Sequence, residues 1–140
     1  MPLDEQQPAF ANTTAATFRR NIGSIIKAAQ SNHIEVVLST FAYNKHLHET
    51  QYTYYHQTAY RQGFEQHNAA MKEIGQHEDL LVVDLAGDFP TEDESLFSGP
   101  VHLNSKGTEI KANIFHDAIL QAGLIDKMVE SQKPSGDRAY

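Results

Sequence analysis

Residues 35–41, Glu-Val-Val-Leu-Ser-Thr-Phe, and residues 80–85, Leu-Leu-Val-Val-Asp-Leu, decide the fold class of this chain. Their apolar residues are consecutive instead of alternating, which is typical of parallel strands that are covered on both faces. The stretch between them is long enough for the helical crossover that parallel strands require. We therefore predict two parallel, adjacent strands in an α/β sheet.

Residues at helical spacing predict helices before, between and after the two strands. One side of each helix is marked by Phe18, Ile22, Ile25, Ile26 and Ala29; by Phe64, Asn68, Met71 and Ile74; and by Ile110, Ile114, Phe115, Ala118 and Ile119. Asn12, Thr13 and Thr14 offer a cap for the first helix. We expect the second helix over 58–75 and the third over 106–122, ended by Gly123, with a last short helix from Leu124.

A sheet of two strands is too small for these helices. Both of its outer edges lack a partner, and it offers little area on which three helices can pack. The sequence therefore implies missing strands, or a partner or second copy that supplies them. Residues 1–13 and 131–140 are polar, and we expect a flexible N-terminal segment and a flexible tail there.

Composition excludes several function classes. The 140 residues leave room for at most one domain, and a hydrophobic content of 40% permits a core. A formal charge of -7 without a basic stripe argues against nucleic acid as a partner. No run approaches a membrane span, and the first residues lack the features of a signal peptide. The absence of cysteine excludes disulfides and a cysteine nucleophile but leaves the compartment open.

Residues 97–107, Phe-Ser-Gly-Pro-Val-His-Leu-Asn-Ser-Lys-Gly, place one histidine in a turn before the third helix. Pro100 on one side and an Asn104-Ser105 cap on the other make this loop short and stiff. An imidazole exchanges protons near neutral pH, so a histidine held in this way suits a general base. His102 is therefore the catalytic candidate; the alternative is a turn histidine whose ring only bonds a nearby carbonyl.

The motif Val-His-Leu-Asn-x-x-Gly at 101–107, after a strand ending in Val-Asp-Leu, resembles the last conserved block of the SGNH (GDSL-like) esterases and lipases. The resemblance spans about residues 14–122. It implies a three-layer α/β/α, flavodoxin-like fold with parallel strands, of which residues 14–130 are the C-terminal half and the N-terminal strands are missing. It also implies hydrolysis or transfer of acyl esters, with a small-molecule ester or an acylated carbohydrate as substrate and His102 activating a serine.

Two departures from the family pattern stand out. The family has an aspartate three residues before the histidine, where this chain has Gly99, and its Gly-Asp-Ser nucleophile motif and its oxyanion-hole glycine and asparagine are not found here. Nearby acids without the expected spacing are Asp84, Asp88, Asp93 and Glu94, and Asp84 is expected to bond amides of its own turn. Turn or cap roles are predicted for Ser39, Ser98 and Ser105.

These departures leave two hypotheses for the chain. In the first, it belongs to a serine esterase and is inactive without the missing N-terminal half. In the second, it is a non-catalytic remnant or binding module with the same fold. A nucleotide-binding α/β piece is disfavoured because no glycine-rich phosphate loop follows either strand. Residues 40–43 and 84–87 leave the carboxyl ends of the strands, and with His102 they are expected to line one cleft.

The segment 43–60 is rich in tyrosine and histidine. Aromatic rings with polar tips suit a lid or an acceptor surface for a partly apolar ester or a sugar. We favour the alternative, an exposed linker that ends in a helix start. His46 and His48 with His56 or His67 resemble part of a metal site. Because no carboxylate or cysteine stands at matching intervals, we predict neither a metal nor a cofactor.

Overall fold

The computed structural model describes residues 15–46 and 58–131, and its elements follow the predicted α/β order. They are α2 (Ala16–Ser31), β1 (Val37–Ser39), α3 (Thr58–His77), β2 (Leu81–Val83), α4 (Leu85–Asp88), the 3-10 helix η2 (Glu94–Leu96), α5 (Ser105–Gln121) and α6 (Leu124–Ser131). The expected flexible ends and the cap at 12–14 lie outside the described residues. The short α4 and η2 were not predicted, because one helical turn leaves no periodic pattern.

The two strands are parallel and adjacent, as the sequence predicted. Val37 lies opposite Leu81 and Ser39 lies opposite Val83. Both strands are shorter than the predicted ranges, and after β2 the chain turns into α4. One more ladder bond, from the Thr40 amide to the Val83 carbonyl at 3.0 Å, extends the pairing past the assigned ends.

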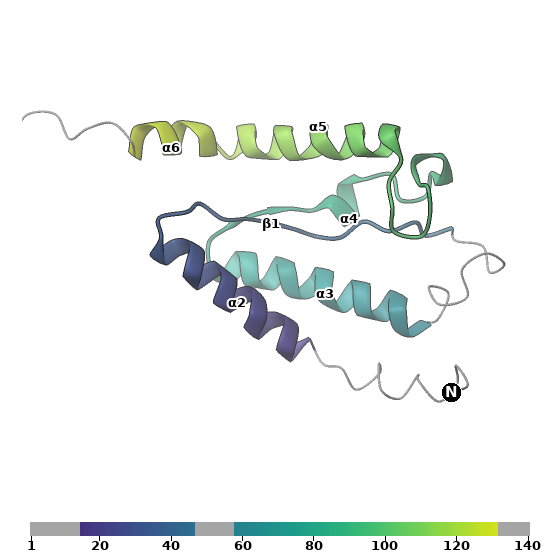
Figure 1. The fold of residues 1–140 in the computed structure, drawn as a ribbon, viewed down its shortest axis with the longest axis horizontal. Helices are drawn as coiled ribbons and strands as arrows, with labels where there is room; N and C mark the ends of the chain where they lie inside the picture. Colours follow the sequence, from purple (N-terminus) through teal and green to yellow (C-terminus); the bar gives the residue numbers. More distant parts are fainter. Residues whose placement is uncertain (1–14, 47–57, 132–140) are drawn as a thin grey trace, which may run out of the picture.

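Helices cover the sheet from both sides. Figure 1 shows α2 and α3 below the strands and α5 with α6 above them; α3 contacts both strands, and α5 contacts β2. This arrangement explains why apolar residues are consecutive in the strands. Burial is nevertheless incomplete: Leu38 and Val83 are buried, whereas Val37 and Leu81 are only half-buried.

Apolar surface remains open around this small sheet. Each strand has one edge without a partner among the described residues. The large apolar side chains that stay exposed are Ile25, Ile34, Phe41, Leu120, Ile125, Met128 and Val129. Two strands with three long helices therefore leave backbone edges and apolar area uncovered, as expected for so small a sheet.

A hydrophobic core cluster lies at the carboxyl ends of the strands, beneath the start of α5. It is formed by Ala42, Leu85, Phe89, Leu96 and Phe97. Gly107 allows the first turn of α5 to approach η2, because a Cβ there would press against the Leu96 carbonyl oxygen. At the other end of α5, Gly123 takes a left-handed conformation with φ of 62° and ends the helix, as predicted.

Candidate functional site at the carboxyl ends of the strands

A closed loop carries His102 between η2 and α5. Phe97 and Leu103 form an antiparallel bridge at its base. Across the loop, the Ser98 amide donates to the His102 carbonyl at 2.8 Å, and the Ser98 hydroxyl approaches the same oxygen at 3.4 Å. These contacts fix the backbone that presents the histidine.

Asn104 caps α5 directly after this loop. Its side-chain oxygen accepts from the Gly107 amide at 3.0 Å, and its amide nitrogen donates to the Ser95 carbonyl at 2.6 Å. The predicted cap is confirmed, with Ser105 as the first helical residue. The asparagine thus joins η2 to α5 and stiffens the loop from its C-terminal side.

The His102 loop lies at the end of the sheet where β1 leaves it. The amide of Asn44, five residues beyond β1, donates to the Pro100 carbonyl at 3.0 Å, and Figure 1 shows the loop before α5 beside this segment. The His102 side chain is exposed, and its ring makes no hydrogen bond to another described residue. Ligands of open α/β sheets bind at this end.

No acidic side chain orients the His102 ring among the described residues. Asp93 accepts from the Ser95 amide and hydroxyl at the start of η2, and these bonds lower its pKa. Asp84 and Asp88 make no bond to the ring, and Glu94 lies within η2. Position 99 lies beside the ring, because a Cβ there would stand 3.9 Å from His102 Cδ2. Since residue 99 is glycine, it supplies no carboxylate to the ring.

The three serines of interest are likewise not bonded to the His102 ring in the described part of the chain. Ser98 lies in the turn and Ser105 starts α5, as predicted. The prediction for Ser39 is wrong, because it is the last residue of β1 and its hydroxyl donates to the Thr40 carbonyl at 2.8 Å. The consecutive apolar residues beside Ser39 predict a strand, and Ser39 belongs to that strand in the structure.

A polar cluster joins the ends of the two strands. The buried Thr40 hydroxyl donates to Asp84 Oδ1 at 2.9 Å and accepts from the Ala86 amide at 2.8 Å. Lys72 of α3 donates to Asp84 Oδ2 at 2.5 Å. Partial burial alone would raise the pKa of Asp84, but the hydrogen bonds from Lys72 and Thr40 outweigh it and hold the pKa below its usual value.

The prediction that Asp84 bonds amides of its own turn is confirmed for the Gly87 amide, but its stronger partners, Lys72 and Thr40, were not predicted. Lys72 and Thr40 lie 12 and 44 residues away in sequence, so no local pattern could indicate them. The Gly87 amide adds a smaller contribution that lowers the pKa of Asp84. The cluster fixes how the segments after β1 and β2 leave the sheet.

Asn68 of α3 fixes the same region from below. Its side chain is buried; Oδ1 accepts from the Phe41 amide at 2.7 Å, and Nδ2 donates to the Phe41 carbonyl at 3.0 Å. The asparagine therefore satisfies the backbone of Phe41 as a neighbouring strand would. The sequence placed Asn68 on one side of the predicted helix, but it gave no indication that Asn68 bonds the backbone of Phe41.

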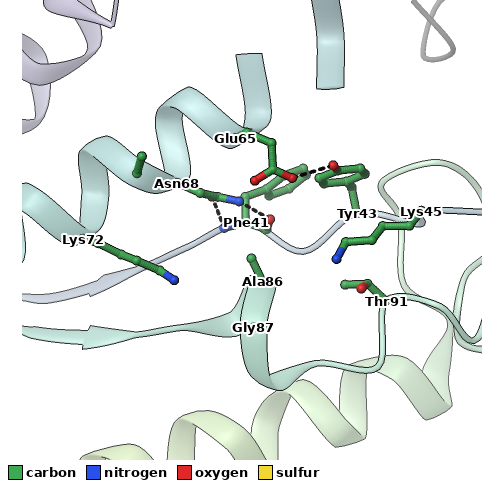
Figure 2. A pocket seen from close by; sticks show the side chains of 10 residues that line it. Phe41, Tyr43, Lys45, Glu65, Asn68, Lys72, Ala86, Gly87 and Thr91 are labelled. Atoms are coloured by element: carbon green, nitrogen blue, oxygen red, sulfur yellow. Dashed lines mark hydrogen bonds between the residues drawn. The ribbon is translucent and has the colours of Figure 1, made fainter. Parts of the chain in front are cut away.

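A pocket of about 280 Å³ opens beside these groups. Its walls come from the segment after β1, with Phe41, Tyr43 and Lys45; from α3, with Glu65 and Lys72; and from the turn after β2. Figure 2 shows the two lysines extending toward the space from opposite ends. The two strand-end segments thus line one pocket, as predicted, but His102 is not among its lining residues.

Tyr43 forms part of the wall and is buried. Its hydroxyl donates to Glu65 Oε1 at 2.8 Å. Burial and this bond to the Glu65 carboxylate raise the pKa of Tyr43 to about 12. Tyr43 and Asn44 are therefore packed and not part of an exposed linker, whereas Lys45 and His46 are exposed. The helix start expected in this segment is confirmed, because α3 begins at Thr58, and residues 47–57 lie outside the described residues.

The histidines considered for a metal site do not gather in the described ranges. His46 pairs with Glu92 at 2.6 Å, and His67 stacks on Phe18 with ring centroids 4.2 Å apart. His48 and His56 lie outside those ranges. Within 15–46 and 58–131, no three His, Asp or Glu side chains form a group able to hold a metal, and no helix has the length and apolar character to cross a bilayer.

Comparison with known proteins adds one finding. No family model and no curated protein matches this sequence. A Bacteroides fragilis protein whose crystal structure is described as that of a putative acylhydrolase matches with a TM-score of 0.60 at 22% identity. The match covers 74% of this chain and 50% of the other. This likeness shows the fold. The chain spans about half the length of that solved protein.

Proposed function

We propose that this chain carries the general base of an acyl-ester hydrolase of the SGNH type, and that His102 is that base. The carrying observation is the placement of the ring: exposed, on a loop closed at its base, at the end of a parallel sheet where ligands bind. The match to a protein described as a putative acylhydrolase, which covers half of that protein, supports ester hydrolysis over other reactions of α/β folds.

In this proposal the nucleophilic serine comes from the N-terminal half of the domain. His102 accepts the serine proton as the hydroxyl attacks the ester carbonyl, and the imidazolium then gives that proton to the departing alcohol. A water, deprotonated by the same ring, then attacks the acyl-enzyme; the acyl–serine bond breaks, the serine oxygen takes that proton back from the imidazolium, and the acid is released. The chain's own contribution is to hold one imidazole whose two ring nitrogens are both available for these proton transfers.

The domain arrangement belongs to the same proposal. Residues 14–130 form the C-terminal half of a three-layer α/β/α domain, and the remaining strands pair with an open edge of the two-stranded sheet. Half-buried Val37 and Leu81 and the exposed Ile25 and Ile34 are side chains that such a half would cover. The proposed partner is therefore this missing half, or a second copy where the half is absent.

Replacing His102 by glutamine tests the assignment. In the protein as its cell makes it, His102→Gln is expected to lower kcat/KM for a p-nitrophenyl ester by at least about 10²-fold, the usual contribution of a general base. His116→Gln is the matched control, since His116 is also exposed and pairs only with its neighbour Asp117. Full activity in a folded His102→Gln variant would contradict the proposal.

One observation favours a second candidate, a non-catalytic protein with the same fold. The position beside the His102 ring that an orienting acid would fill is Gly99, and no described carboxylate replaces it. The coding sequence upstream of the Met1 codon separates the two candidates. An in-frame Gly-Asp-Ser followed by further strands supports the enzyme, and a start site at Met1 supports the remnant.

A further inference from the structure

We propose that the pocket between α3 and the two strand ends binds a hydroxyl-rich ring of monosaccharide size, the sugar part of an acylated carbohydrate. The volume sets the first limit. At about 280 Å³ it lies just below the roughly 300–1,000 Å³ of pockets that hold drug-sized ligands, so it has room for one ring and little more. Its floor is formed by the small residues Ala86 and Gly87 (Figure 2).

The aromatic wall suits the apolar face of a sugar ring. Phe41 keeps 42% of its surface exposed although its backbone is held on both sides by Asn68. Its ring packs on Phe64 with centroids 5.2 Å apart, and the Tyr43 ring packs on the same phenylalanine at 5.0 Å. Such supported rings present rigid apolar faces at low entropic cost, against which the C–H face of a sugar can lie.

The polar groups favour hydroxyls over an anion. Lys45 and Lys72 each have a carboxylate nearby, Glu92 at 3.9 Å and Asp84 at 2.5 Å, and Glu65 adds another carboxylate at the wall. The site therefore carries no excess positive charge. Each ammonium has three donors, and a carboxylate has more acceptor sites than the single bond from Tyr43 to Glu65 uses. A hydroxyl donates and accepts, so a polyol can satisfy both kinds of group.

The pocket and the His102 loop share one short piece of chain. Tyr43 and Lys45 line the pocket, and Asn44 between them donates to the Pro100 carbonyl of the His102 loop. The Lys45 amide also donates to the Thr91 carbonyl at 3.2 Å. A ring held in the pocket would therefore lie beside the segment that positions His102. The role as a substrate subsite rests on the proposed function; binding of the ring itself does not.

Binding is tested on the full chain by nuclear magnetic resonance with methyl β-glucoside and methyl N-acetyl-β-glucosaminide, each titrated to about 50 mM to reach millimolar affinities. We expect saturable shifts of the Lys45, Gly87 and Thr91 amides. Lys45→Met should weaken binding about tenfold through the loss of a charged donor. The matched control Lys27→Met, on the exposed surface of α2, should leave it unchanged.

Ala69→Leu provides a second variant, because Ala69 is an exposed α3 residue at the pocket and a larger side chain fills the space without removing a charge. It should abolish the shifts while the rest of the spectrum stays that of a folded chain. Absence of saturable shifts with both glycosides, equal binding in Ala69→Leu, or stronger shifts with inorganic phosphate or hexanoate would each overturn the inference. Since no ester is present, this outcome is independent of whether His102→Gln loses activity.

Discussion

Replacing Gly99 by aspartate asks whether the His102 loop has lost an orienting acid. A Cβ at this position would contact only His102 Cδ2, at 3.9 Å, and Gly99 does not have a left-handed φ. An aspartate therefore fits without backbone strain. A half-turn of the imidazole about its Cβ–Cγ bond exchanges Cδ2 for Nδ1, and the new carboxylate can then accept the Nδ1 proton.

The size of the gain follows from the exposure of the ring. A carboxylate about 4 Å from an imidazolium in water contributes about 1 kcal/mol, or about fivefold in rate. A buried triad loses about 10⁴-fold in kcat when its aspartate is changed to asparagine, which sets the upper limit. Because the described His102 side chain is exposed, we expect an increase in kcat/KM of about fivefold to tenfold.

The assay is ester hydrolysis by the protein as its cell makes it, together with urea unfolding and nitrogen-15 shifts of the His102 ring. Gly99→Asn is the matched control, since it adds a side chain of the same size without charge. The free energy of unfolding should change by at most about 1 kcal/mol, because replacing glycine mainly restricts the unfolded chain. A folded, equally stable Gly99→Asp variant with unchanged kcat/KM and unchanged ring shifts would show that position 99 has not lost an orienting acid.

Three further predictions concern the frame around the site. Gly107→Ala should lower the free energy of unfolding by about 1–3 kcal/mol, because the added Cβ presses on the Leu96 carbonyl. The control Gly63→Ala, with open space around it, should raise the free energy of unfolding by up to about 1 kcal/mol. Equal effects in urea unfolding would rule out the close approach of α5 to η2 at Gly107. Asp84 has a lowered pKa, so the stability it contributes is present above the unfolded pKa of 3.8 and is lost as pH falls through the lower pKa of the folded state. Asp84→Asn should remove this part of the acid unfolding curve. An unchanged curve would contradict the Lys72–Asp84–Thr40 cluster. Tyr43 has its pKa raised to about 12, so ultraviolet titration should show one tyrosine that stays protonated well above pH 10. The stability that this group contributes should be lost between pH 10.0 and about 12. Glu65→Gln should shift the titration to lower pH, and no shift would exclude the Tyr43–Glu65 bond as a cause of the raised pKa.

The sequence predicted the features that depend on neighbouring residues. Consecutive apolar residues indicated the parallel strands, because helices cover both faces of the sheet. Asn104 indicated the start of α5 and Gly123 its end, since a side-chain cap and a left-handed φ are local properties. His102 lies beside the strand ends because its loop follows the carboxyl end of β2 and contacts the segment after the parallel strand β1.

The features that the sequence did not reveal depend on residues far apart in the chain. Asn68 bonds a backbone 27 residues earlier, and Asp84 bonds Thr40 across 44 residues. Neither partner has a spacing that a periodic pattern can detect. The α3 wall of the predicted pocket was missed for the same reason, because it meets the two strand-end segments only in the folded chain. The role of Gly107 also depends on distant packing, since the contact of η2 with α5 excludes a side chain at this position.

His102 is proposed to activate a serine supplied by the other half of a hydrolase domain. A fluorophosphonate probe, which reacts with activated serines, tests this directly on the protein as its cell makes it, with the labelled residue located by mass spectrometry. We expect one labelled serine outside residues 1–140 and a labelling rate at least about 10²-fold lower in His102→Gln. Labelling at Ser39, Ser98 or Ser105, no labelled serine, or a rate unchanged by His102→Gln would exclude this role of His102.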